Sequence, residues 1–120
     1  MQKLTKAEEE IMQMIWDHSD VTVSQLIEKM KEPKPPHSSV SSIVRILEKK
    51  GFVDHRPEGR SFVYFPVIGK TEYSRFSIRR LVSNYFEGSM NELVSFLVKE
   101  NDLTISELEK IKEQLKTDHQ

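Results

Sequence analysis

The 120-residue sequence contains no cysteine, which excludes disulfide bonds, thiolate metal sites and cysteine nucleophiles. It has only four glycines and no glycine-rich loop of the kind that cradles phosphates. Its four histidines lack metal-ligand spacing, and none of its serines lies in a nucleophile motif. No apolar run approaches the roughly 20 residues of a membrane span, and no signal-peptide pattern opens the chain. We therefore expect a soluble cytoplasmic protein that is not an enzyme and uses no metal or cofactor.

Apolar residues are also scarce, at 37% of the chain against 31% charged residues. A chain of this length with so little apolar material buries only a modest core by itself. We expect a subunit that completes its core with a partner.

The net charge of −1 conceals an uneven distribution of charge along the chain. Residues 1–33 carry four basic and seven acidic side chains, whereas residues 34–60 carry six basic and three acidic ones. Residues 61–120 carry eight basic and nine acidic side chains. A basic excess confined to one window is typical of a local nucleic-acid contact.

Four capping boxes, which begin at Thr5, Thr22, Ser89 and Thr104, mark predicted helix starts. The first two open helices over residues 5–18 and 23–30. Two prolines at positions 35 and 36 interrupt the pattern, and a third helix runs from residue 37 or 38 to Gly51.

Residues 52–67 predict a β-hairpin. Aromatic and β-branched residues over 52–56 and 61–67 flank a turn at Pro57-Glu58-Gly59-Arg60. Three helices followed by a hairpin indicate a winged helix-turn-helix domain over residues 1–69, in a mainly α protein of the α+β class.

Residues 70–120 return to helical periodicity, with predicted helices over 71–87, after Ser89 and after Thr104. About 50 helical residues do not easily stabilise themselves, so we expect a dimerisation region that packs against a second copy of the chain. The predicted contacts are Tyr73, Phe76, Leu81, Tyr85, Leu93, Leu97, Ile105, Leu108, Ile111 and Leu115.

The third helix carries the candidate DNA-binding face, opposite its apolar stripe. Short hydroxyls allow a helix to approach bases closely, and basic side chains bind guanine or phosphate. We assign Ser38, Ser39, Ser41, Ser42 and Arg45 to the major groove, and Lys49, Lys50, Arg56 and Arg60 to phosphate or wing contacts. A solvated surface, a winged helix that binds protein, and a ligand-responsive regulator remain alternatives.

These motifs together resemble the penicillinase and methicillin-resistance repressors (BlaI/MecI type), to which the copper-transport repressors are related. The matching segments are Leu4-Thr5-Lys6-Ala7-Glu8, Ile11-Met12, Ile15-Trp16, Thr22-Val23-Ser24, Ser39 to Val44, Leu47 to Val53, the hairpin, Leu93-Val94, Asp102-Leu103 and Ile105 to Leu115.

The resemblance implies a homodimeric repressor that binds a palindromic double-stranded DNA operator. It also implies derepression through a membrane-bound sensor-transducer protease that leads to cleavage in the dimerisation region. Three departures stand out. Ser41 replaces the arginine of the family's Thr-x-Arg-Thr segment, Phe96-Leu97 replaces its cleaved Asn-Phe bond, and the copper repressors' C-terminal cysteines are missing.

Overall fold

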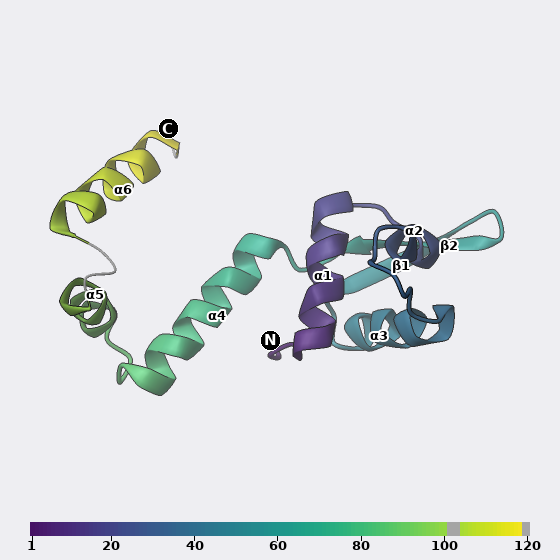
Figure 1. Cartoon of the computed structure of the whole chain (residues 1–120), viewed down its shortest axis with the longest axis horizontal. Coiled ribbons are helices and arrows are strands. Elements are labelled where there is room, and N and C mark those ends of the chain that lie inside the picture. The colour runs from purple at the N-terminus through teal and green to yellow at the C-terminus, as the bar shows by residue number, and fades with distance from the viewer. Residues whose placement is uncertain (101–103, 119–120) are drawn as a thin grey trace. The chain divides into compact units, whose positions relative to one another are not determined.

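A computed structural model describes the backbone of residues 1–100 and 104–118, and the side chains as far as residue 114 (Figure 1). The chain forms two compact units, Met1–Ser77 and Ile78–Gln120.

The first unit contains α1 (Lys6–His18), α2 (Val23–Glu28), α3 (His37–Lys49), β1 (Val53–Glu58) and β2 (Ser61–Pro66). Thr5 and Thr22 form complete capping boxes at the starts of α1 and α2. Gly51 follows α3 with a φ of 85°, the left-handed conformation that glycine adopts without strain. This order of elements confirms the predicted fold class.

Two predicted segments, the second helix and the hairpin turn, are shorter in the structure than the sequence indicated. Helix α2 ends at Glu28, because the amides of Lys29 and Met30 bond to carbonyls three residues back and tighten the last turn. The hairpin turn contains only Gly59 and Arg60, since Pro57 and Glu58 lie in β1 opposite Phe62 and Ser61. Strand β1 is an edge strand, where a proline is tolerated.

The core of the first unit lies between the three helices and the base of the hairpin. Its largest fully buried side chains include Met12, Ile15, Leu26, Leu47 and Phe52. Two backbone hydrogen bonds between Val21 and Tyr64, of 3.0 and 2.8 Å, attach the segment before α2 to β2. Figure 1 shows the hairpin projecting from the helices.

Helix α4 (Lys70–Tyr85) begins in the first unit. The Leu4 amide donates a 2.9 Å hydrogen bond to the Tyr73 hydroxyl, and the Tyr73 ring lies 5.4 Å from that of Phe52. Tyr73 is therefore buried in the core of the first unit, which corrects its assignment as a dimer contact. Phe76, one turn later, packs partly against the same core. The helical periodicity of residues 70–85 could not indicate that the start of this helix packs in the first unit while the rest belongs to the second.

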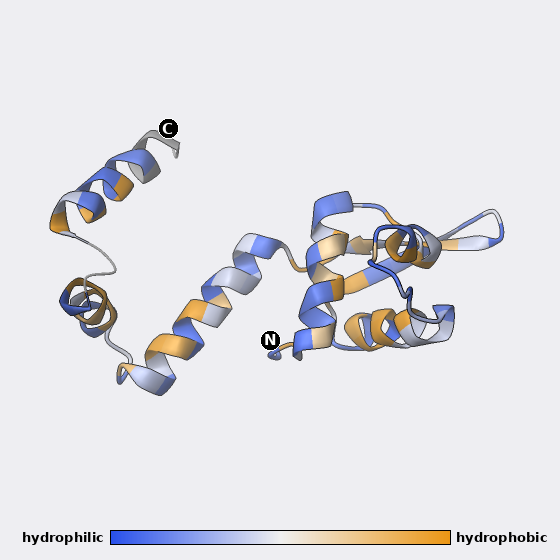
Figure 2. Cartoon of the chain, viewed as in Figure 1, coloured by the Kyte–Doolittle hydropathy of each residue, from blue (hydrophilic) through white to orange (hydrophobic). Residues whose placement is uncertain are grey.

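The second unit contains the rest of α4, α5 (Met90–Lys99) and α6 (Ile105–Asp118). Ser89 and Thr104 accept hydrogen bonds from the Glu92 and Glu107 amides, which is the half of each predicted capping box that the hydroxyl supplies. Val82 is the only buried apolar residue among the side chains that the structure describes in this unit. Hydropathy colouring shows apolar residues interspersed with hydrophilic ones along these helices (Figure 2). Within the part of the chain that is described, no helix has the length and apolarity to cross a membrane.

The predicted dimer contacts in this unit differ in exposure. Leu93, Leu97 and Leu108 are half-buried, and the Leu115 side chain lies outside the described residues. The exposed large apolar residues are Ile78, Leu81, Tyr85, Met90, Val94, Phe96, Ile105 and Ile111.

Candidate nucleic-acid interface

The exposed face of α3 presents Ser38, Ser42, Arg45 and Lys49 as one stripe. Their spacing of four, three and four residues places them in line on a helix, opposite the buried stripe that includes Val44. The Ser42 hydroxyl donates to the Ser38 carbonyl over 2.8 Å, so its oxygen remains available as an acceptor. Ser39 is exposed and Ser41 is half-buried. The four predicted serines thus all belong to α3. Three are exposed and one is half-buried.

A groove of about 410 Å³ lies beside this stripe. Ser41, Arg45 and Glu48 line it from α3, and His55, Arg60 and Tyr64 line it from the hairpin. The groove brings together two predicted cations from different elements. Its Glu48, His55 and Tyr64 were not predicted as site residues, because no local sequence pattern indicates which residues of α3 and the hairpin face each other.

The pKa of the Tyr64 phenol depends on the charges around this groove. Burial raises the pKa of the Tyr64 phenol, and the negative charge of Glu48 raises it further, while Arg45 opposes both effects. The groove therefore carries an acidic side chain as well as basic ones.

Three of the six cations of the basic window have neither an ion pair nor a side-chain hydrogen bond among the described residues: Arg45, Lys49 and Arg60. All three are exposed. Lys34, by contrast, donates to the carbonyls of Ile27 and Glu28 and caps α2. The unpaired cations are the ones that lie on the α3 stripe or line the groove.

Lys50, predicted as a phosphate or wing contact, forms an ion pair inside the first unit. Its ammonium lies 2.5 Å from Glu8 Oε1, with only 20% of the Lys50 side chain exposed. Burial alone would raise the pKa of Glu8, but hydrogen bonds from Lys50 and the Thr5 amide outweigh it and lower the pKa. The pair joins the end of α3 to the first turn of α1.

Arg56 is also placed differently from the prediction. Its guanidinium donates to Asp20 over 3.0 Å, and its Cζ lies 5.8 Å from the Phe65 ring centroid. The hydrogen bond to Asp20 raises the pKa of Arg56. Because successive strand residues point to opposite faces, Arg56 points away from the groove that His55 lines.

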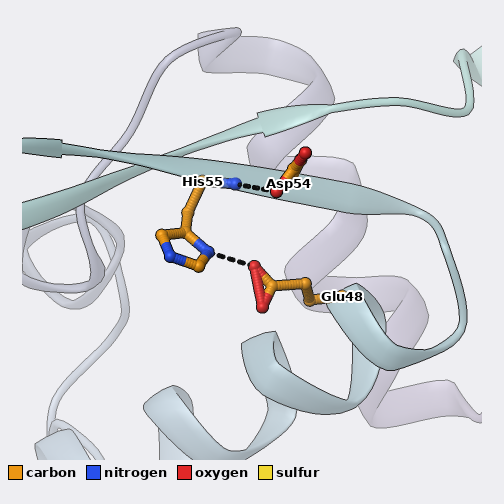
Figure 3. A group of neighbouring side chains, drawn as sticks. All are labelled: Glu48, Asp54 and His55. Atoms are coloured by element: carbon orange, nitrogen blue, oxygen red, sulfur yellow. Dashed lines mark hydrogen bonds and ion pairs between the residues drawn. The ribbon is translucent and has the colours of Figure 1, made fainter.

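Glu48, Asp54 and His55 form a cluster at the base of the hairpin (Figure 3). One potential ligand atom of each lies within 4.8 Å of the others. His55 Nδ1 donates to Glu48 Oε1, whereas Asp54 accepts a 2.7 Å hydrogen bond from the His55 backbone amide. Figure 3 shows the Asp54 carboxylate and the His55 ring on different sides of the strand, so His55 and not Asp54 forms the side-chain hydrogen bond of this cluster to Glu48 of α3.

Comparison with known proteins finds similarity to DNA-binding repressors. A family model described as "Penicillinase repressor" matches residues 4–117. The penicillinase repressor of Bacillus licheniformis is 29% identical over 111 residues, which cover 91% of this chain and 86% of that protein.

Two solved structures match about three fifths of this chain. The DNA-binding domain of the repressor BlaI is 34% identical, with a TM-score of 0.52 over 61% of this chain and 94% of that one. Monomeric Bacillus licheniformis BlaI, in complex with the blaP half-operator, is 32% identical, with a TM-score of 0.50 over 60% of this chain and 89% of that one.

Proposed function

The chain belongs to the penicillinase repressor family, and we propose that it acts as a homodimer on a palindromic operator. It is a DNA-binding transcriptional repressor and not an enzyme. The observation that carries the placement of the DNA contact is that three cations without an ion-pair or hydrogen-bond partner lie beside the serine face of α3 in a winged-helix unit.

Helix α3 enters the major groove in this proposal. Ser38, Ser39, Ser41, Ser42 and Arg45 contact base edges or the phosphates beside them. Lys49 binds a phosphate, and Arg60 carries the wing to the neighbouring backbone or minor groove. Because Lys50 and Arg56 are ion-paired within the first unit, this proposal assigns them no DNA contact.

The second unit supplies the dimer contacts. Among the side chains that the structure describes in this unit, eight large apolar ones are exposed, including Tyr85 at 77% exposure. An apolar surface of this kind on a small helical unit is stabilised by burial against a second copy. Two copies present two α3 helices, so the operator has two half-sites about 10 bp apart or a multiple of that spacing.

Derepression in this proposal takes place in the cytoplasm and depends on a membrane sensor protease, as in the β-lactam repressors. Phe96-Leu97 stands where those repressors are cut between asparagine and phenylalanine. Helix α5 contains this segment, and Phe96 is 48% exposed. Cleavage at this position would therefore need a protease that accepts leucine after phenylalanine.

The test selects duplexes from a random-sequence pool with the full-length protein and then measures affinity by fluorescence anisotropy. We expect an inverted repeat to be enriched, and Arg45→Ala to weaken binding by about 1–3 kcal/mol. Arg56→Ala is the comparison variant. It also removes one arginine, but from the face of the hairpin that points away from the groove, and it should weaken binding less than Arg45→Ala.

Two outcomes would contradict the proposal. A pool from which no duplex is enriched would favour a winged helix that binds protein. Equal affinity of the parent and Arg45→Ala would show that the recognition face is assigned wrongly.

A further inference from the structure

The hairpin is held at its base by two consecutive residues of β1, one on each face. His55 Nδ1 donates to Glu48 of α3 on the groove face. Arg56 donates to Asp20, in the turn between α1 and α2, on the other face. The Arg56 pair joins the hairpin to the turn before α2, whereas the His55 pair joins it directly to α3 (Figure 3).

The His55 ring also joins the two strands of the hairpin. It lies 4.8 Å from the Phe62 ring and 5.6 Å from the Tyr64 ring, both on β2. His55 and Tyr64 are register partners, and Tyr64 is bonded through its backbone to Val21. A side chain that contacts α3, β1 and β2 together is well placed to set the direction of the hairpin.

Beyond this contact the hairpin depends on its own strand pairing. All residues from Arg56 to Phe62 are exposed, and Arg60 lies at the turn. A two-stranded hairpin is marginally stable by itself. The distance from Arg60 to the α3 stripe therefore depends on how firmly the base of the hairpin is attached.

We propose that Glu48 is a positioning residue, which holds His55 and thereby fixes the wing so that Arg60 and Arg45 contact the same DNA. This inference rests on the proposed function, since it concerns how Arg60 reaches the duplex. Glu48 has a second, opposite effect, because its carboxylate lies in the same groove as two cations that face phosphate. Removal of Glu48 therefore eliminates a repulsive charge as well as the hydrogen bond.

Two variants separate these effects. Glu48→Gln removes the charge but keeps an oxygen that accepts from His55 Nδ1, whereas Glu48→Ala removes both. Both residues are good helix formers, and Glu48 is half-exposed, so both variants should fold. Each is combined with Arg60→Ala, and affinity is measured for the labelled duplex that the parent protein selects from the random pool.

If Glu48 positions the wing, Arg60→Ala weakens binding several-fold in the parent and in Glu48→Gln, but has almost no effect in Glu48→Ala. If Glu48 acts only through its charge, Arg60→Ala has the same effect in Glu48→Ala as in Glu48→Gln, at least as large as in the parent. That second result would overturn the inference.

A measurement without DNA tests the inference separately from the proposed function. ¹⁵N relaxation of the Gly59 and Arg60 amides should show a more mobile turn in Glu48→Ala than in the parent or Glu48→Gln. Equal mobility in all three proteins would overturn the inference. If the parent selects no duplex, the proposed function fails, and this relaxation comparison alone decides the role of Glu48.

Discussion

Lys49 and Lys50 are adjacent lysines with the same side chain, and the structure gives them different surroundings. Lys49 is exposed on the α3 stripe without an ion-pair partner among the described residues, whereas Lys50 lies 2.5 Å from Glu8 and is mostly buried. Replacing each by alanine removes one positive charge. The two variants should therefore have the same net charge but different effects on DNA binding and stability.

Lys49→Ala should change the salt dependence of DNA binding. Each phosphate contact contributes about −0.9 to the slope of log K against log salt concentration. A dimer loses two such contacts, so the slope should become shallower by about 1.8. Anisotropy titrations of the selected duplex measure this slope directly when they are repeated at about five salt concentrations from about 50 to about 300 mM.

Lys50→Ala should leave that slope unchanged and lower stability instead. Glu8 would then keep only its capping bonds in a site where 9% of its side chain is exposed. An under-bonded buried carboxylate costs about 1–3 kcal/mol, and each kcal/mol lowers the Tm of a domain of this size by about 4–8 °C. A slope that changes equally in both variants would refute the distinction between the two lysines.

Three further predictions concern stability and assembly. Because the folded state lowers the pKa of Glu8, the ionised Glu8 stabilises the protein at neutral pH, and this stabilisation is lost as the pH falls below the ordinary glutamate pKa of about 4.3. Urea unfolding across this pH range should show a steeper fall of the unfolding free energy for the parent than for Glu8→Gln. Tyr73→Phe removes the buried acceptor of the Leu4 amide and should cost about 1–3 kcal/mol in unfolding free energy without changing the oligomeric state. Leu81→Asp places a charge on the exposed apolar surface of α4 and should shift sedimentation from dimer to monomer, with the helical circular dichroism of the first unit retained; a variant that remains dimeric would show that this face does not form the interface.

Local patterns were sufficient to predict most of the elements. Thr5 and Thr22 cap their helices through residues three positions away, and Gly51 ends α3 through its own backbone conformation. The serine and Arg45 stripe follows from helical periodicity alone, because neighbours on a helix face are three or four residues apart. These features depend on contacts within about one turn of the chain.

The same patterns could not distinguish the cations that form ion pairs within the fold from those that stay free of one. Residues 34–60 carry six basic side chains, and nothing within that window separates Lys50 and Arg56 from Lys49 and Arg60. The partners that separate them, Glu8 and Asp20, lie 42 and 36 positions away in the sequence.

The winged-helix order and the family could thus be inferred from the sequence alone, and the same sequence predicts α3 as the recognition helix. The tertiary structure decided which charges remain available, because an ion pair forms or fails to form according to distance in space. It also decided that Tyr73 belongs to the first unit, through a hydrogen bond to an amide 69 positions away. Periodicity indicates that a residue is buried, but only folding determines what it is buried against.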